Sequence, residues 1–246
     1  MLGQPPIGAI GGQIKVEEKS NELTALPQLL RLLDIAGCVV TVDALGRQKE
    51  IARQIVSQGG DYVFALKGNQ GLLQERVQTL FAHSETRDGQ RMEQDKTRKL
   101  DKEHGRLEKR SCQTVAAKDW LFYLDPDGEW PRLQTIAKVV AERAGDGVSS
   151  EDTRHFISSL PCDAPLLLQS VRDHWGVENG LHWVLDVAFR EDDSRLRKGH
   201  GAQNFSLLRR LALNLLRHDQ SIKAGIKAKR RRTGWDEAYL LRILAA

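Results

Sequence analysis

The sequence is poor in cysteine, and its three cysteines, Cys38, Cys112 and Cys162, lie far apart in the 246 residues. An odd number of widely spaced cysteines argues against a disulfide framework and against a zinc site with four cysteine ligands. No apolar run approaches the roughly 18 residues that a membrane span needs. The first 20 residues lack the basic start and the long apolar stretch of a secretory signal. These absences predict a cytoplasmic protein with no membrane partner.

The composition shows no bias towards one structural class, and no internal repeat or low-complexity tract is present. Hydrophobic residues make up 40% and charged residues 28% of the chain, which is typical of an ordinary globular protein. The length allows one large domain or two small ones. The net charge of +4 is a mild excess that slightly favours an acidic partner such as nucleic acid.

Residues 13–82 alternate between strand-like and helix-like segments. A short strand is predicted at 13–18, and a helix at 24–37 with Pro27 in its first turn and Gly37 at its end. The β-branched run "CVVTVDAL" and the segment "GGDYVFALKGNQG" are typical of buried strands, and each is followed by a helix-like segment. This order predicts a mostly parallel sheet covered by helices.

The character of the chain changes after residue 83. Residues 84–110 are highly charged with few apolar residues, so they predict a solvated segment or loop. Three strand-like stretches follow, "GRLEKRSCQTV", "RLQTIAKVVAERA" and "TRHFISSL", without long helices between them, which indicates antiparallel pairing. The run "AQNFSLLRRLALNLLRH" predicts an amphipathic helix.

Two carboxylates stand out from this pattern. Asp43 closes the strand-like run "VVTVD", and ligands bind at the carboxyl ends of strands in open α/β sheets. Glu178 lies within residues 171–193, whose spacing of apolar residues predicts one helix, and it shares a face with His174 and His182. An acid from a strand and an acid from a later helix could bracket a Mg²⁺ pair. The alternatives are helix capping by Asp43 and a solvated or salt-bridged Glu178.

Seven stretches of the sequence resemble the DDE transposases of insertion sequences, specifically the H-repeat-associated group. The resemblance extends from about residue 13 to the end of the predicted helix at 202–218, and the stretch from His174 to Arg195 is the most specific part of it. The matching stretches are "KVEEKSNE", "VTVDALGRQKEIA", "GGDYVFALKGNQ", "HGRLEKR", "HFISSL", "HWGVENGLHWVLDVAFREDDSR" and "NFSLLRRLALNLLRH".

The resemblance implies an α/β fold with a ribonuclease-H-like core, a mixed sheet flanked by helices, and an antiparallel β-rich insertion before the last catalytic helix. Such transposases bind two divalent ions, Mg²⁺ or Mn²⁺, through two Asp and one Glu. By similarity, Asp43 corresponds to the second Asp and Glu178 to the Glu. The implied reaction is hydrolysis at a transposon end, followed by attack of the freed 3′-hydroxyl on target DNA. Both steps are in-line phosphoryl transfers, in which positioning and charge neutralisation dominate.

One departure from the family pattern concerns the first Asp, which in the family lies on the first strand of the core. Before Asp43 the sequence contains only Asp34, which falls near the end of a predicted helix. The first strands of the core also have no counterpart. The sequence therefore predicts an N-terminally truncated transposase with an incomplete metal site and impaired catalysis, since the number of charged ligands sets metal affinity.

Several residues are candidate contacts to DNA. Lys67 and Asn69 follow a strand and could touch phosphate, or could belong to an ordinary glycine turn. The tail residues "KAKRRR" have no acid nearby and would release counterions on binding, or form a solvated tail. The full set of candidates is Lys67, Asn69, Arg106, Arg110, His174, Asn179, His182, Arg195, Arg197, Lys198, Lys229, Arg230, Arg231 and Arg232.

The predicted organisation has four parts: an N-terminal part of the core at 1–82, a charged and β-rich insertion at 83–162, the catalytic and C-terminal helices at 163–220, and a basic tail at 221–246. The partners expected are transposon ends and target DNA, with a homo-oligomer or a mixed assembly with intact transposase, at the nucleoid when DNA is bound. Two other functions remain open. One is a non-catalytic DNA-binding remnant that interferes with an intact transposase; the other is a zinc hydrolase using His174, Glu178 and His182.

Overall fold

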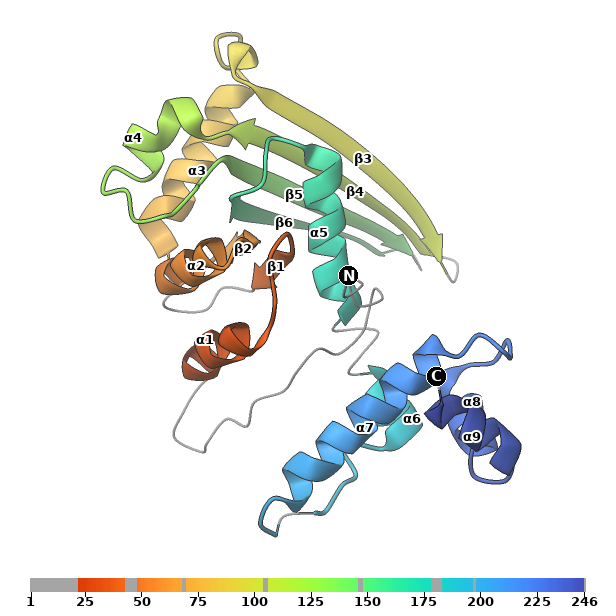
Figure 1. Ribbon diagram of the computed structural model, residues 1–246. Coiled ribbons are helices and arrows are strands. Elements are labelled where there is room, and N and C mark those ends of the chain that lie inside the picture. Colours follow the sequence, from red (N-terminus) through yellow and green to blue (C-terminus); the bar gives the residue numbers. More distant parts are fainter. Residues whose placement is uncertain are drawn as a thin grey trace. The chain divides into compact units, whose positions relative to one another are not determined.

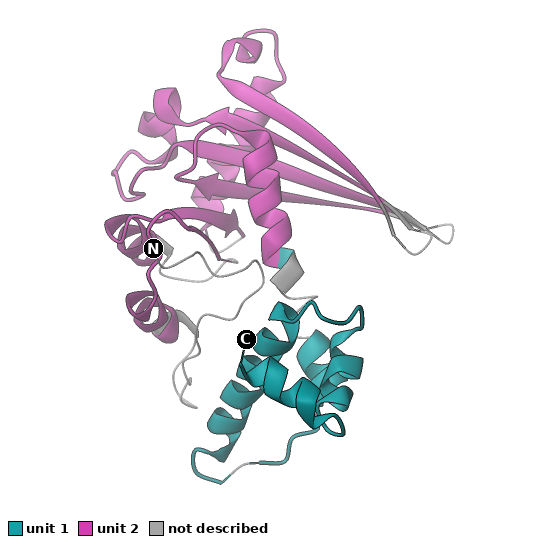
Figure 2. Cartoon of the chain, turned by 45° about the vertical axis from the view of Figure 1, so that its right-hand side comes forward, with its two compact units in different colours: residues 1–17, 175–246 teal, residues 18–174 magenta. Residues whose placement is uncertain are grey.

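The computed structural model describes residues 22–42, 48–67, 70–103, 106–145, 148–177, 183–196 and 198–245. These residues form two compact units (Figure 2), one within residues 18–174 and one that includes residues 175–246. The larger unit contains a sheet flanked by helices, and the smaller unit is helical.

The larger unit is built on a mixed sheet whose described strands follow the order β1-β2-β6-β5-β4-β3 (Figure 1). β1 and β2 are parallel, as the sequence predicted, and every later pairing is antiparallel. The strands are β1 (Val39–Val42), β2 (Asp61–Leu66), β3 (Gln94–Glu103), β4 (Arg106–Ala116), β5 (Thr135–Gly145) and β6 (Val148–Ser158).

One face of this sheet is covered by the helices that connect its first strands. Tyr62 and Phe64 of β2 are fully buried in a cluster that includes Ile51, Ile55 and Val77 of the two covering helices. Burying a side chain of this size contributes about 1.5–3 kcal/mol, so the cluster anchors the sheet. The helices of this part of the chain are α1 (Glu22–Leu32), α2 (Gln48–Ser57), α3 (Gly71–Ser84) and α4 (Leu121–Leu124), with short 3₁₀ turns at Gly89–Arg91 and Lys118–Trp120.

The opposite face of the sheet is covered by α5 (Ala164–Val177). The helix is tied to the far edge strand at its start, where the amide of Ala164 donates to Asp95 Oδ2 at 2.9 Å. Farther along it, Arg172 Nη2 lies 3.0 Å from Asp101 Oδ2 of the same edge strand. These two contacts place α5 across the antiparallel part of the sheet, on the face that bears Asp95 and Asp101.

The prediction of a solvated loop over residues 84–110 is wrong for much of this range. Residues Gln94–Glu103 form β3, which pairs with β4 over its whole length. β3 is the last strand in the sheet order, and charged side chains are common on edge strands because they prevent further pairing. Charge density alone therefore gave the wrong structure for an edge strand.

The smaller unit contains α6 (Trp183–Phe189), α7 (Gly201–His218), α8 (Ile226–Arg232) and α9 (Glu237–Leu244). Leu216, Tyr239 and Ile243 are buried together at its centre. The amphipathic helix predicted at 202–218 is confirmed as α7. The predicted basic tail at 221–246 is corrected, because its described residues fold into α8 and α9 and share this core.

Residues 171–193, where the sequence predicts a helix, are helical in their described parts up to Val177 and from Trp183 to Phe189. α5 ends at Val177 and α6 begins at Trp183, and residues 178–182 lie outside the described part of the chain. Among the described helices, none has the length and apolar character that crossing a membrane requires.

Candidate functional site

A hydrogen bond joins β1 to α5 at residues that precede the two predicted catalytic carboxylates in the sequence. Thr41 Oγ1 lies 3.0 Å from His174 Nδ1, and the two residues are 133 positions apart in the sequence. Thr41 is the second residue before Asp43, and His174 is the fourth residue before Glu178. Asp43 and Glu178 themselves lie outside the described residues. The fold thus brings together the segments that lead into the two acids.

The carboxyl ends of β1 and β2 lie at the same edge of the sheet, since the strands are parallel and Val42 pairs with Phe64. Lys67 follows the end of β2 directly and is exposed. β6 continues past this end, because its pairing with β2 stops where Leu66 meets His155. Beyond the carboxyl end of β2, β6 therefore has no partner on that side among the described strands.

A pocket of about 340 Å³ lies where β6 projects beyond β2. Its polar lining includes the exposed Lys67 and the ion pair between Arg154 Nε and Asp152 Oδ2, which measures 2.9 Å. Burial, followed by the nearby Lys138 ammonium, lowers the pKa of His155 below its ordinary value of 6.5. The pocket is lined by Ala65, Leu66, Lys67, Gln74, Asp152, Thr153, Arg154 and His155.

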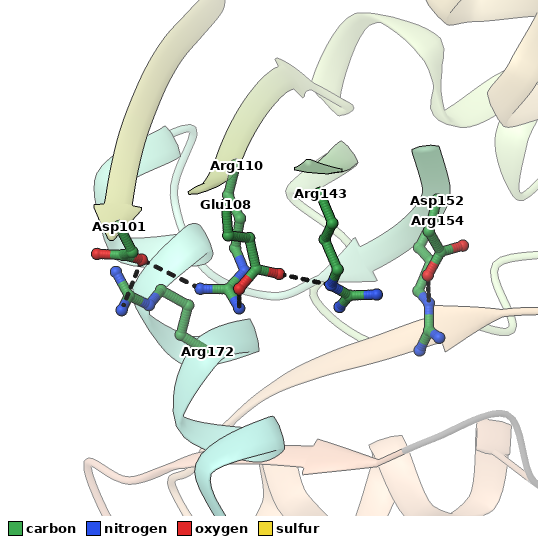
Figure 3. A network of polar contacts seen from close by, with 7 residues as sticks. All are labelled: Asp101, Glu108, Arg110, Arg143, Asp152, Arg154 and Arg172. Atoms are coloured by element: carbon green, nitrogen blue, oxygen red, sulfur yellow. Dashed lines mark hydrogen bonds and ion pairs between the residues drawn. The ribbon is translucent and has the colours of Figure 1, made fainter. Parts of the chain in front are cut away.

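Arg110, a predicted DNA contact, is held between two carboxylates. Its Nη1 lies 3.2 Å from Asp101 Oδ2, and its Nη2 lies 2.5 Å from Glu108 Oε2. Asp101 also pairs with Arg172 of α5, and Glu108 also pairs with Arg143 of β5 (Figure 3). Arg110 is thus the centre of an ion-pair network, and its side chain is only 23% exposed.

The basic residues of α8 divide into buried and exposed ones. Lys229 is 7% exposed, and its ammonium donates to the carbonyls of Leu216 and Asp219. Burial and these partners disfavour a contact of its ammonium with phosphate, and its predicted role at DNA stays a prediction. Arg230 donates to the carbonyl of Ala188 at the end of α6, while Arg231 is exposed.

The last basic residue of this helix is also engaged within its own unit. Arg232 Nε donates to Asp236 Oδ2 at 2.9 Å, and its guanidinium lies over the ring of Tyr239. Arg195 and Lys198, between α6 and α7, are exposed as predicted for DNA contacts. These two residues and Arg231 are exposed to solvent in the described part of the helical unit, and their contact with DNA stays a prediction.

Several predicted site residues lie outside the part of the chain that the structure describes. For Arg106 the backbone is described in β4 but the side chain is not. The residues not described at all are Asp43, Asn69, Glu178, Asn179, His182 and Arg197. Their predicted roles stay predictions.

The sequence analysis missed Arg143, Arg154 and Arg172, which complete the network of Figure 3. A local signal for one of them exists, because Asp152 and Arg154 are two positions apart in a strand-like run and so share a face. The pairing of Glu108 with Arg143 joins different strands and needs their register. The sequence pattern by itself could not supply that register.

Comparison with known proteins decides the family. The family described as "Transposase DDE domain" matches residues 8–215 of this chain. The chain belongs to the DDE transposases. Its mixed sheet flanked by helices is consistent with the ribonuclease-H-like core of this family, as the resemblance in the sequence implied.

Curated relatives of this DDE transposase chain include a protein named for the H repeat. "H repeat-associated putative transposase YhhI" of Escherichia coli strain K12 is 41% identical over 95% of this chain. "Putative protein YbfL" of the same strain is also 41% identical over 95% of the chain, and "Putative transposase YncI" of Escherichia coli O157:H7 is 36% identical over 97%. The chain spans 62%, 62% and 61% of the lengths of these three relatives, respectively. No solved structure gives a significant match.

Membership of the DDE family implies use of a divalent metal. Within the described ranges, no group of three His, Cys, Asp or Glu side chains is placed to hold a metal ion. Asp43 and Glu178, the two acids that the resemblance implies as metal ligands, lie outside those ranges.

Proposed function

We propose that this transposase chain carries part of a metal-dependent site for DNA cleavage and strand transfer, with Asp43 and Glu178 as ligands. The observation that supports this most directly is the hydrogen bond between Thr41 and His174. A strand places residues i and i+2 on one face, and a helix places residues i and i+4 on one face. Asp43 and Glu178 stand in these relations to Thr41 and His174, so the bond favours their convergence.

Carboxylate oxygens suit Mg²⁺ and Mn²⁺, which are hard cations. When bound, such ions neutralise charge on the transferring phosphoryl group and favour deprotonation of the attacking hydroxyl. The role of the chain's own residues is to hold the acids in place and to position DNA. The 246 residues offer two of the three carboxylates that the resemblance implies, and we propose that by themselves they are impaired in catalysis.

The proposed substrate is DNA at the ends of an insertion sequence. Lys67 lies at the edge of the sheet where β1 and β2 end, so it is suited to contact phosphate beside the reaction centre. A homo-oligomer, or a mixed assembly with a full-length transposase, is part of this proposal because strand transfer joins transposon ends to a second DNA.

The proposal is tested by DNA cleavage and strand-transfer assays in Mg²⁺ or Mn²⁺. The chain is compared with a version extended at its N-terminus by the corresponding residues of YhhI. The extended chain should cleave and join DNA, and Asp43→Asn or Glu178→Gln should each lower its rate by at least about a hundredfold. Replacing a group that only hydrogen-bonds a metal ligand already lowers activity by about 10- to 100-fold, and a direct ligand should matter at least as much.

Asp34→Asn serves as the matched control, because Asp34 is the other aspartate at the start of the chain and is exposed. Its activity should equal that of the unsubstituted extended chain. If Asp43→Asn is as active as Asp34→Asn, the proposed ligand is wrong. If the 246 residues alone cut DNA as fast as the extended chain, the idea of an incomplete site is wrong.

Two other outcomes would favour the alternatives. DNA binding that is sensitive to salt, unchanged in Asp43→Ala and accompanied by no strand transfer even in the extended chain, would support a non-catalytic DNA-binding protein. One tightly bound zinc per chain in elemental analysis would support the hydrolase. That reading needs His174 as a ligand, and its Nδ1 is hydrogen-bonded to Thr41.

A further inference from the structure

The face of the sheet that α5 crosses carries a row of arginines, each contacting at least one carboxylate. Arg110 of β4, Arg143 of β5 and Arg154 of β6 point to the same side, with Arg172 of α5 at one end of the row (Figure 3). The ion pairs between described residues join four guanidinium groups to three carboxylates, so the seven residues of Figure 3 carry one more positive than negative charge. The exposed ammonium of Lys67 lies in the pocket beside Arg154.

Strand register shows that this is the face to which Thr41 belongs. Residues paired across a ladder point to the same face, and so do residues two apart in a strand. Thr41 pairs with Val63, which pairs with Ser158. Ser158 lies four residues beyond Arg154 in β6, so Thr41 and Arg154 share a face.

The same reasoning extends across the next two strands. Arg154 pairs with Val139, four residues before Arg143 in β5. Arg143 pairs with Glu108, two residues before Arg110 in β4. The row of strand arginines therefore lies on the face that Thr41 shares, and β2 separates its first member from β1. From β6 to β4 it crosses two spacings of about 4.8 Å, roughly 10 Å in all.

Arg143 has the geometry of a prepared phosphate ligand. Its Nε is 2.8 Å from Glu108 Oε1, and its side chain is 57% exposed. The bond to Nε fixes the plane of the guanidinium, while no hydrogen bond from its two Nη groups occurs among the described residues. An arginine fixed in this way loses less side-chain freedom on binding phosphate than a free one.

Arg154 also contacts a carboxylate through its Nε. Its Nε contacts Asp152 Oδ2, and both residues line the pocket that also contains Lys67. Arg110 differs from these two, because both its Nη groups contact carboxylates. Arg143 is exposed and Arg154 is half-buried at the pocket, so these two are placed to meet an external anion, while Arg110 holds the network together.

We propose that this face binds the phosphate backbone of the DNA that leads away from the reaction centre, with Lys67 and Arg154 nearest to it and Arg143 farther along. The inference rests on the proposed function for the direction of the DNA. The phosphate contacts themselves follow from charge complementarity. Ion pairs near the surface contribute little to the stability of a protein. Stabilisation of the sheet alone therefore does not account well for arginines on three neighbouring strands.

The test is equilibrium binding of the full chain to a labelled 30-base-pair DNA duplex over a range of salt concentrations, in EDTA so that metal ligands play no part. Each phosphate contact contributes about 0.9 to the slope of log affinity against log salt. Arg143→Gln and Arg154→Gln should each reduce this slope by about one, and should weaken binding roughly fivefold to tenfold at low salt.

Arg98→Gln is the matched control. Arg98 lies on the edge strand β3 and pairs with Ser111, so it is on the opposite face from Arg110, and it is exposed. It removes the same charge and should leave the slope unchanged. Arg143→Lys keeps the charge but loses the bond to Glu108, so it should retain the slope and bind more weakly than the unsubstituted chain.

The inference is overturned if Arg143→Gln and Arg98→Gln have the same effect on the slope, or if the unsubstituted chain does not bind the duplex at low salt. A purely structural network would instead lower the midpoint of thermal unfolding in Arg143→Gln without changing the slope. Failure of the proposed metal site is detected separately. In that case Asp43→Asn would be as active as the unsubstituted extended chain, while the salt slopes of the arginine variants would still change as expected.

Discussion

Lys229 offers a direct test of the difference between charge in the sequence and charge in the fold. The sequence predicts that it binds DNA with its basic neighbours, whereas the structure places it in the core of the helical unit. Its ammonium donates to the carbonyl of Leu216 at 3.2 Å and to that of Asp219, and lies 3.6 Å from Asp219 Oδ2. We therefore expect Lys229→Met to destabilise this unit and to leave DNA binding of the folded chain unchanged.

The magnitude follows from the partners that Lys229 loses. Methionine retains much of the aliphatic stem but donates no hydrogen bond, so two carbonyls and a carboxylate lose a partner. Removing one partner of a buried ion pair typically destabilises a protein by about 3–5 kcal/mol. We expect about 3 kcal/mol, because Asp219 still accepts from Ser221 N and from the Tyr239 hydroxyl.

Hydrogen–deuterium exchange of peptides from α7 to α9 measures this change locally. A loss of about 3 kcal/mol corresponds to roughly 150-fold faster exchange, since 1.4 kcal/mol is a factor of ten. Lys227→Met is the control, because Lys227 is an exposed lysine on the same helix and its loss changes the net charge equally. If both variants exchange alike and Lys229→Met lowers the salt slope of DNA binding by about one, the buried assignment is wrong.

Three further predictions concern single hydrogen bonds and titrating groups. Thr41→Val should lower the free energy of unfolding, measured in urea, by about 1 kcal/mol, because valine has no hydroxyl to bond with His174 Nδ1. Thr41→Ser keeps a hydroxyl and should leave the free energy of unfolding unchanged. Hydrogen bonds from Ser221, then from the Tyr239 hydroxyl, lower the pKa of Asp219 from 3.8 to about 2. Its stabilising contribution is present above pH 4 and lost as the pH falls towards 2, and acid titration of Asp219→Asn should lack this component. Burial lowers the pKa of His155 below 6.5, so stability should fall as the pH drops below that value, and His155→Gln should show a smaller loss between pH 7 and pH 5.

Local patterns in the sequence were sufficient to predict the strands and helices whose apolar residues recur at regular spacing. The run "CVVTVDAL" has the β-branched character of a buried strand, and its first part forms β1 beside the parallel β2. The spacing of leucines in residues 202–218 gave α7 in the same way. In both cases the neighbours in sequence are sufficient to define the buried side.

Long-range register decided what charged segments do. Residues 94–103 look solvated until they are paired with β4, and Arg143 is an ordinary surface arginine until register brings it beside Glu108. Likewise, the five basic residues of the run "KAKRRR" look alike in the sequence, yet Lys229 and Arg232 have partners within the helical unit while Lys227 and Arg231 are exposed. Which cation meets which carboxylate depends on contacts between distant residues.

The sequence by itself determined the family of this protein and the order of its main strands and helices, because motifs and hydrophobic periodicity are local properties. Only the tertiary structure brought Thr41 to His174, buried Lys229 and aligned arginines from three strands on one face. The physical reason is that a side chain's partner, burial and orientation depend on strand register and helix packing, which connect residues far apart in the chain.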